Sequence, residues 1–231
     1  MRYLQLDFIR GIAIILMIIF HVNFDLNNFH FITIDIYNHH SRFWFYFRMI
    51  ILTLFMLSVG ISLALSHERG IETKKVFKRF LTLGVASLVI TLATMVTFPH
   101  TWIYFGVLHF VTLASLIALL FLRLEWLTLL IGISIVALFN LNIISMQWLY
   151  NALSSTLYLP KHTEDLVPFT PWLGVVFIGL FIGKKRLFTF PLTKNRFTDS
   201  IALLGKHSLA IYLIHQPIFF GLIAGADFLL H

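Results

Sequence analysis

The sequence predicts an all-α fold, a polytopic membrane helix bundle of about seven transmembrane helices, or about eight at most. Of its 231 residues, 59% are hydrophobic and only 12% are charged, whereas about 25% of the residues in a soluble domain are charged. The mean hydropathy is +0.89. Seven spans of roughly 20 residues use most of this length, so we expect residues 1–231 to form a single integral-membrane domain.

Apolar segments long enough to cross a bilayer follow one another along the chain. We expect them at residues 3–22, 43–66, 80–97, 102–122, 126–144, 167–183 and 201–230. The second ends in FMLSVGISLALS, whose small residues favour close helix packing. Pro99 ends the third, and Pro168 and Pro171 lie in the first turns of the sixth, where proline is tolerated. The long polar segment 145–165 predicts a short surface helix.

Lys and Arg residues are concentrated in every second connection between the predicted spans. This pattern predicts how the chain is oriented in the membrane. With the N-terminus inside, loops 67–79, 123–125 and 184–198 are cytoplasmic and basic, while loops 23–42, 98–101 and 145–165 face outward with only Arg42 and Lys161. We therefore expect a multi-pass protein of the cell's inner (plasma) membrane with a cytoplasmic N-terminus. We attribute the net charge of +7 to cytoplasmic loops that lie beside anionic lipid or bind an anionic ligand, and not to a surface that binds nucleic acid.

The first predicted span, LDFIRGIAIILMIIFHVNFD, carries its ionisable residues on one face. At helical pitch Asp7, Arg10, His21 and Asp25 return to nearly the same side of the helix. Ionisable side chains are costly in hydrocarbon, so this face should line a bundle interior or a wet cavity. Asp7 and Arg10 could also be a simple ion pair at the helix end, and His21 a hydrogen-bonded structural histidine.

Other polar residues lie in or beside the predicted spans and need partners there. We expect them to line a cavity with Asp25 or to cross-link helices: Asn23, His109, His215 and Gln216. His39 and His40 lie in an outer loop, where solvation alone could explain them. The histidines show neither the spacing of stacked haems on one helix nor an HExxH zinc motif, so no metal is predicted, although a single haem stays open. The chain has no Cys, which excludes disulfides, thiolate metal sites and a cysteine nucleophile.

Two basic clusters fall on the predicted cytoplasmic side. Their simplest explanation is the positive-inside pattern, and the alternative is a surface for a polyanion such as a nucleotide phosphate. Arg79, at the membrane edge, is the strongest candidate of that group. The clusters comprise Arg69, Lys74, Lys75, Lys78 and Arg79, and Lys184, Lys185 and Arg186.

Several blocks of the chain resemble one known family. LDFIRGIAIILMIIFH is similar to the first-helix signature of the transmembrane acyltransferase superfamily. The further blocks FKRFLTLGVASLVIT, YFGVLHFVTLASLIALLFLR, DLVPFTPWLGVVFIGLFIG and LGKHSLAIYLIHQPIFFGLI, together with the FMLSVGISLALS segment, are similar in order to the heparan-alpha-glucosaminide N-acetyltransferase catalytic-domain family, specifically its short bacterial members. The resemblance covers most of residues 4–223.

This resemblance implies a membrane acyltransferase that takes an acetyl group from cytosolic acetyl-CoA and gives it to a sugar amine or hydroxyl on the other side. It implies a catalytic role for His21, with Arg10 as the motif arginine. The lysosomal enzymes have Asn at the matching helix position and a functional histidine in the following loop, which would be His39 or His40. Both assignments of the catalytic base stay open.

The residues themselves suit that chemistry. A histidine can accept the acceptor's proton, and Arg10, Asn23, His109 or Gln216 could stabilise the oxyanion. We expect acetyl-CoA as the co-substrate, with its phosphates on the cytosolic basic loops, and a sugar or glycan as the acceptor. The protein is expected to lie in membrane lipid and to have no nucleic acid partner. A homodimer is one open oligomeric state. The alternative from another class is a transporter or channel with an intramembrane His/Arg pathway.

Overall fold

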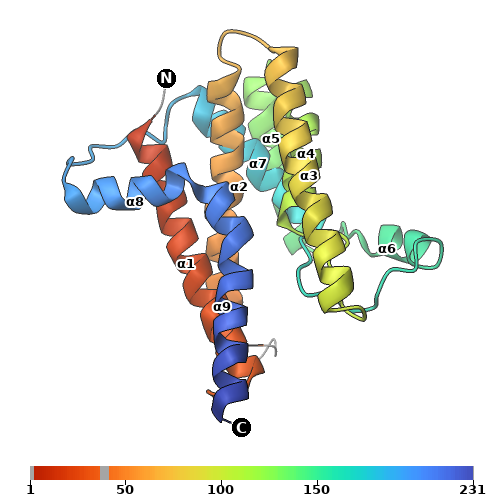
Figure 1. Cartoon of the computed structure of the whole chain (residues 1–231). Coiled ribbons are helices and arrows are strands. Elements are labelled where there is room, and N and C mark those ends of the chain that lie inside the picture. The colour runs from red at the N-terminus through yellow and green to blue at the C-terminus, as the bar shows by residue number, and fades with distance from the viewer. Residues whose placement is uncertain (1–2, 37–41, 231) are drawn as a thin grey trace. The chain divides into compact units, whose positions relative to one another are not determined.

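The computed structural model describes residues 3–36 and 42–230. Apart from an isolated bridge between Phe105 and Leu166, the regular structure in these residues is helical. The helices are α1 (Leu4–Asn28), α2 (Arg42–Ser66), α3 (Thr73–Thr97), α4 (Val107–Leu120), α5 (Glu125–Asn140), α6 (Gln147–Ser154), α7 (Phe169–Lys184), α8 (Arg196–Lys206) and α9 (Ser208–Leu230) (Figure 1).

The predicted membrane helix bundle is confirmed. In the described chain, α1, α2, α3 and α9 are long and apolar enough to cross a membrane, and α4, α5 and α7 are shorter apolar helices. The short surface helix expected within 145–165 is α6. Several boundaries differ from the predicted ones: α3 begins at Thr73 rather than at residue 80, since its charged first turns are also helical, and α4 begins only at Val107.

The predicted span 201–230 is wrong at its start. The structure has two helices here, with α8 ending at Lys206 and α9 beginning at Ser208. Asn195 starts α8 through a capping box, in which its side chain accepts from the Thr198 amide at 2.9 Å. α8 is amphipathic, with Arg196, Asp199 and Lys206 along it, so it is too polar to continue an apolar span.

The described chain divides into two compact units. Unit 1 comprises residues 1–55 and 188–231, and unit 2 comprises residues 56–187. Unit 1 therefore holds α1, the first part of α2, α8 and α9, whereas unit 2 holds the rest of α2 and α3 to α7.

In unit 1, α8 lies across α1, and α9 runs beside α1 (Figure 1). Glycine allows α1 and α8 to touch backbone to backbone. A Cβ on Gly11 would lie 1.9 Å from the Ile201 carbonyl oxygen, and one on Gly205 would lie 1.8 Å from that of Asp7. Farther along α1, Ile14 and Met17 form a buried core with Ile51 of α2.

In unit 2, glycines again set the helix spacing. A Cβ on Gly60 would lie 2.1 Å from the carbonyl oxygen of Val176, and one on Gly179 would lie 2.4 Å from that of Leu57. The expectation that the small residues of α2 favour close helix packing is therefore confirmed at Gly60. α5 and α7 meet in the same way at Gly132 and Gly174.

At one end of unit 2, the connection between α3 and α4 is hydrogen-bonded to the connection between α6 and α7. The Glu164 amide donates to the Thr101 carbonyl at 3.0 Å, and the Val167 amide to the Phe105 carbonyl at 3.2 Å. Asp165 accepts a hydrogen bond from the Val107 amide at 3.1 Å. Because Val107 is the first residue of α4, the carboxylate satisfies a helix N-terminus from a distant part of the sequence.

Candidate active site

A histidine pair joins the two long helices of unit 1. His21 of α1 and His215 of α9 pack edge to face, with ring centroids 4.9 Å apart and planes at 75°. His215 is only 5% exposed. The polar face expected on the first helix therefore meets a polar position of the last helix.

Backbone contacts orient both rings. His21 Nδ1 lies 2.9 Å from the Met17 carbonyl oxygen, and His215 Nδ1 lies 2.7 Å from that of Tyr212. A carbonyl oxygen can only accept, so each Nδ1 is assigned the proton when the ring is neutral. Each Nε2 then carries a lone pair, which is the arrangement that a general base needs.

One helical turn beyond His21, α1 and α9 meet again through polar side chains. Asp25 is 1% exposed, and its Oδ1 accepts a hydrogen bond from Gln216 Nε2 at 2.9 Å. Asp25 Oδ2 and Gln216 Oε1 are buried and have no hydrogen-bond partner among the described residues. Asp25, His215 and Gln216, expected as cavity residues, thus lie with His21 in one cluster of unit 1.

Arg48 is a residue of this region that the sequence analysis missed. It lies on α2, in the part that belongs to unit 1, close enough to His21 for their charges to interact. The available signal was a single arginine inside the predicted apolar span 43–66, because a charged residue at membrane depth indicates function. Arg48 adds a positive charge to the region of His21.

The remaining candidates of the first helix lie elsewhere. Asp7 and Arg10 form an ion pair of 3.6 Å near its N-terminus. Asn23 donates to the Ile19 carbonyl oxygen of its own helix at 2.8 Å. His39 and His40 lie outside the described residues.

His109, in unit 2, has both ring nitrogens engaged. Its Nδ1 accepts from the Gly106 amide at 3.2 Å, and its Nε2 lies 3.0 Å from Thr91 Oγ1. Thr91 in turn donates to the Ile103 carbonyl at 2.8 Å. These contacts tie α3 to the start of α4.

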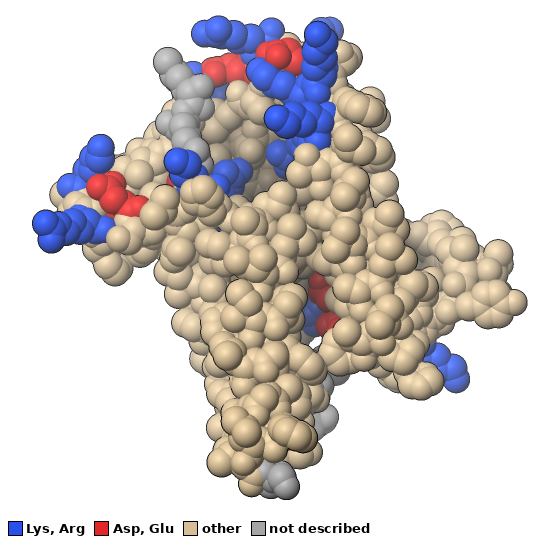
Figure 2. Space-filling view, in the orientation of Figure 1, with Lys and Arg blue, Asp and Glu red and all other residues tan. Residues whose placement is uncertain are grey.

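The basic loops of unit 2 meet at one end of that unit. Lys185 pairs with Glu125, Arg186 pairs with Glu68 at 2.5 Å, and Lys75 pairs with Glu72 at 2.6 Å. Figure 2 shows Lys and Arg side chains gathered where α2 ends and α3 begins. The remaining basic candidates of this surface are Arg69, Lys74, Lys78, Arg79 and Lys184.

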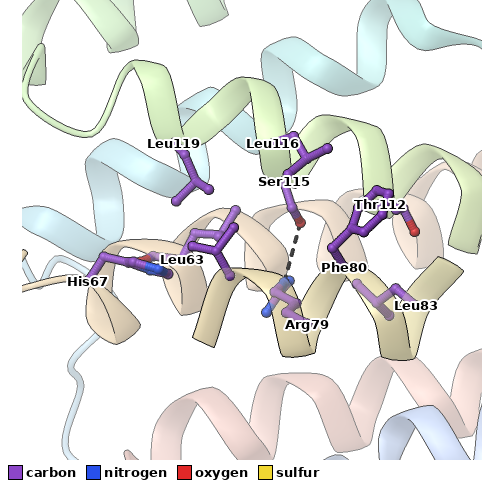
Figure 3. A pocket seen from close by; sticks show the side chains of 10 residues that line it. Leu63, His67, Arg79, Phe80, Leu83, Thr112, Ser115, Leu116 and Leu119 are labelled. Carbon is purple, nitrogen blue, oxygen red and sulfur yellow. Dashed lines mark hydrogen bonds between the residues drawn. The ribbon is translucent and has the colours of Figure 1, made fainter. Parts of the chain in front are cut away.

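A narrow pocket opens in unit 2 between α2, α3 and α4. Arg79 and Ser115 face each other across it, with Arg79 Nε donating to Ser115 Oγ at 3.4 Å (Figure 3). His67, which the sequence analysis did not single out, lines the same pocket. It is 7% exposed, and its Nε2 has no partner in the described part of the chain. The pocket has room for about one water molecule.

Metal ligands are not grouped in the part of the chain that the structure describes. No set of three or more His, Asp or Glu side chains there is arranged to hold a metal ion. The polar side chains around His21 include its ring partner His215 and the Asp25 carboxylate with its amide partner Gln216.

Comparison with known proteins identifies the family. The family model for heparan-alpha-glucosaminide N-acetyltransferase, catalytic, matches residues 2–217. No curated protein and no solved structure matched the chain in the corresponding searches. Since the match spans most of the chain and both histidines of the unit 1 pair, the protein belongs to the heparan-alpha-glucosaminide N-acetyltransferase catalytic family, a family of membrane acetyltransferases.

Proposed function

We propose that this protein, as one integral-membrane domain over residues 1–231, transfers an acetyl group from cytosolic acetyl-CoA to an amine or hydroxyl of a sugar acceptor on the extracytoplasmic side. The cell's inner membrane, with the N-terminus in the cytoplasm, is the proposed location. The observation that carries this proposal is the His21–His215 pair, in a chain of a membrane acetyltransferase family.

His21 is the proposed general base. Its Nδ1 is held by the Met17 carbonyl at 2.9 Å, which leaves Nε2 to accept the proton of the attacking amine or hydroxyl. The thioester carbonyl develops negative charge as the acceptor attacks, and a cationic donor stabilises that charge. Arg48 is the proposed source of this positive charge, since its charge acts on His21. Arg10, which forms an ion pair with Asp7 at 3.6 Å, is the other proposed donor.

The basic end of unit 2 is the proposed contact for the CoA phosphates. Lys75, Lys185 and Arg186 already bind carboxylates, so a phosphate would compete with those glutamates. Arg79 lines the narrow pocket at this end, where its Nε donates to Ser115 Oγ at 3.4 Å. Its planar guanidinium can bind phosphate oxygens through two parallel hydrogen bonds, so we propose it as the foremost phosphate ligand. Arg69, Lys78 and Lys184 add positive charge at this end.

The test is acetyl-CoA binding and slow hydrolysis by the purified protein in detergent. Wild type should bind acetyl-CoA and release CoA, and His21→Ala should bind but not turn over. His39→Ala is measured in parallel, because the loop histidine is the other candidate base; loss of turnover there with activity retained in His21→Ala would move the base to the loop. Failure of the wild type to bind any CoA species at millimolar concentration would contradict the acyltransferase function and favour a transporter or channel.

A further inference from the structure

The short helix α6 is amphipathic and exposes its apolar side. At helical pitch this side carries Trp148, Leu149, Ala152 and Leu153. The other side carries Gln147, Asn151 and Ser154. No residue of α6 is buried against the rest of the described chain, and Trp148 is 64% exposed. A short helix is stabilised mainly by burial of its apolar face, so this face requires a partner.

Tyr150 attaches α6 to unit 2 from the side away from Trp148. Its hydroxyl donates to the Pro160 carbonyl at 3.2 Å, and its ring lies 6.3 Å from that of Tyr104, in the connection between α3 and α4. Two residues along a helix correspond to about 200° of rotation, so Trp148 and Tyr150 point in nearly opposite directions. The attachment of α6 therefore leaves its apolar side uncovered.

The position of α6 along the bundle follows from α3. This helix begins in the basic loop at Thr73 and ends at Thr97 after 25 residues, a length of about 37 Å, whereas the hydrocarbon core of a bilayer is about 30 Å thick. The connection that follows α3 is hydrogen-bonded to the segment after α6, through the Thr101 carbonyl and the Glu164 amide at 3.0 Å. α6 therefore lies at the end of unit 2 opposite the basic loops (Figure 1), where a membrane meets water.

The composition of α6 and of its flanks selects the occupant. α6 contains no Lys, Arg, Asp or Glu. Exposed apolar residues continue from it in both directions: Leu141, at the end of the apolar helix α5, and Ile143 precede it, and Leu157 follows it. The apolar side of α6 is thus continuous along the chain with the surface of a membrane helix. A bilayer interface suits such a helix, because it takes apolar side chains below the headgroups, polar ones above them, and Trp at their level.

We propose that α6 is an interfacial membrane helix, with its Trp148 side embedded in the lipid at the boundary opposite the basic loops and its Asn151 side in water. Because α6 carries no charged residue, apolar burial holds it there, and anionic headgroups are not required. This lipid-binding surface is independent of acetyl transfer.

The experiment uses the absence of Cys from the chain, which makes one introduced cysteine a unique site for a nitroxide spin label. Ala152→Cys labels the apolar side, and Asn151→Cys, the adjacent exposed position, is the matched control on the polar side. Both are measured in phosphatidylcholine nanodiscs that hold one copy of the protein. The ratio of collisions with oxygen, which concentrates in lipid, to collisions with a water-soluble nickel complex should be about tenfold higher for the Ala152→Cys label.

Trp148 gives a second measurement that needs no label. Phospholipids with brominated acyl chains quench a tryptophan that they touch, so Trp148→Phe should lower the quenched part of the fluorescence. Trp172→Phe is the control, because Trp172 is buried in α7 and should contribute nothing to the quenched part.

Three results would overturn the lipid site. Equal access of the nickel complex to both labels would place α6 in water. Protection of the Ala152→Cys label from both oxygen and nickel would mean that protein, not lipid, covers this face. Equal quenching of the wild type and Trp148→Phe would exclude contact of Trp148 with acyl chains. None of these measurements needs acetyl transfer, so this inference and the proposed function fail separately.

Discussion

The His21 and His215 rings touch edge to face at 4.9 Å, although they come from opposite ends of the chain. Each ring is also held by a carbonyl oxygen of its own helix, Met17 for one and Tyr212 for the other. The pair is therefore fixed in orientation before any substrate binds. Preorganised groups of this kind are what acyl transfer requires, because reorganisation at the moment of reaction raises the barrier.

Replacing Arg48 should reduce the chemical step. If its guanidinium stabilises the oxyanion, Arg48→Gln should lower kcat about 100-fold and leave the Kd for acetyl-CoA unchanged. Arg48→Lys should recover part of the loss, since the charge returns without the forked geometry. Arg42→Gln, an exposed change on the same helix, is the control for loss of positive charge. Equal effects of the Arg48 and Arg42 changes would exclude the assigned role.

Replacing Arg79 should weaken acetyl-CoA binding without slowing turnover at saturation. Arg79→Gln removes one charge-assisted contact to phosphate, so the Kd should rise about tenfold, and the difference should shrink at high salt. Isothermal titration at two ionic strengths measures both effects. Lys161→Gln makes a similar change of charge at an exposed position outside the basic loops and should leave the Kd within about twofold. A salt-independent Kd would argue against phosphate binding at this surface.

Gly205→Ala should destabilise unit 1. The new Cβ would lie 1.8 Å from the Asp7 carbonyl oxygen, so α8 must move away from α1. The expected cost is about 1–3 kcal/mol, measured as a lower thermal unfolding temperature in detergent. Gly221→Ala on α9 is the control, because its Cβ would meet nothing within 4 Å, and alanine there favours the helix. Equal melting temperatures for the two variants would refute the close approach of α1 and α8.

Asp165→Ala should loosen the start of α4. Its carboxylate accepts from the Val107 amide at 3.1 Å, and loss of such a cap costs about 1 kcal/mol. Asp165→Asn keeps an acceptor oxygen and should cost much less. Amide hydrogen exchange at Val107 measures the effect directly: it should accelerate in the alanine variant and change little in the asparagine variant. Equal exchange in all three proteins would mean that the cap contributes nothing.

Much of the fold could be predicted from hydropathy, because a bilayer requires long apolar helices. The prediction was wrong for residues 201–206, which belong to α8, a helix that crosses α1 instead of running along it (Figure 1). An apolar average over 201–230 does not reveal that the chain breaks at His207, just after Gly205 packs against the Asp7 backbone. The Val107 amide at the start of α4 is likewise bound by Asp165, which is distant in sequence.

The candidate site was predicted in part. The helical period placed His21 and Asp25 on one face, and the need of buried polar groups for partners predicted a role for His215 and Gln216. Which residue meets which could not be deduced, because contacts between α1 and α9 depend on the register of two helices far apart in the chain. His67 was missed because its burial follows from the pocket of unit 2, not from any local pattern.

The most direct test of the account is a single-turnover measurement of acetyl transfer from labelled acetyl-CoA to glucosamine by the wild type and His21→Gln. The account predicts a rate about 10²–10⁴-fold lower in His21→Gln, with acetyl-CoA binding and the thermal transition unchanged. A transfer rate within about threefold of wild type, in a variant that binds acetyl-CoA normally, would contradict the role of His21 as the base.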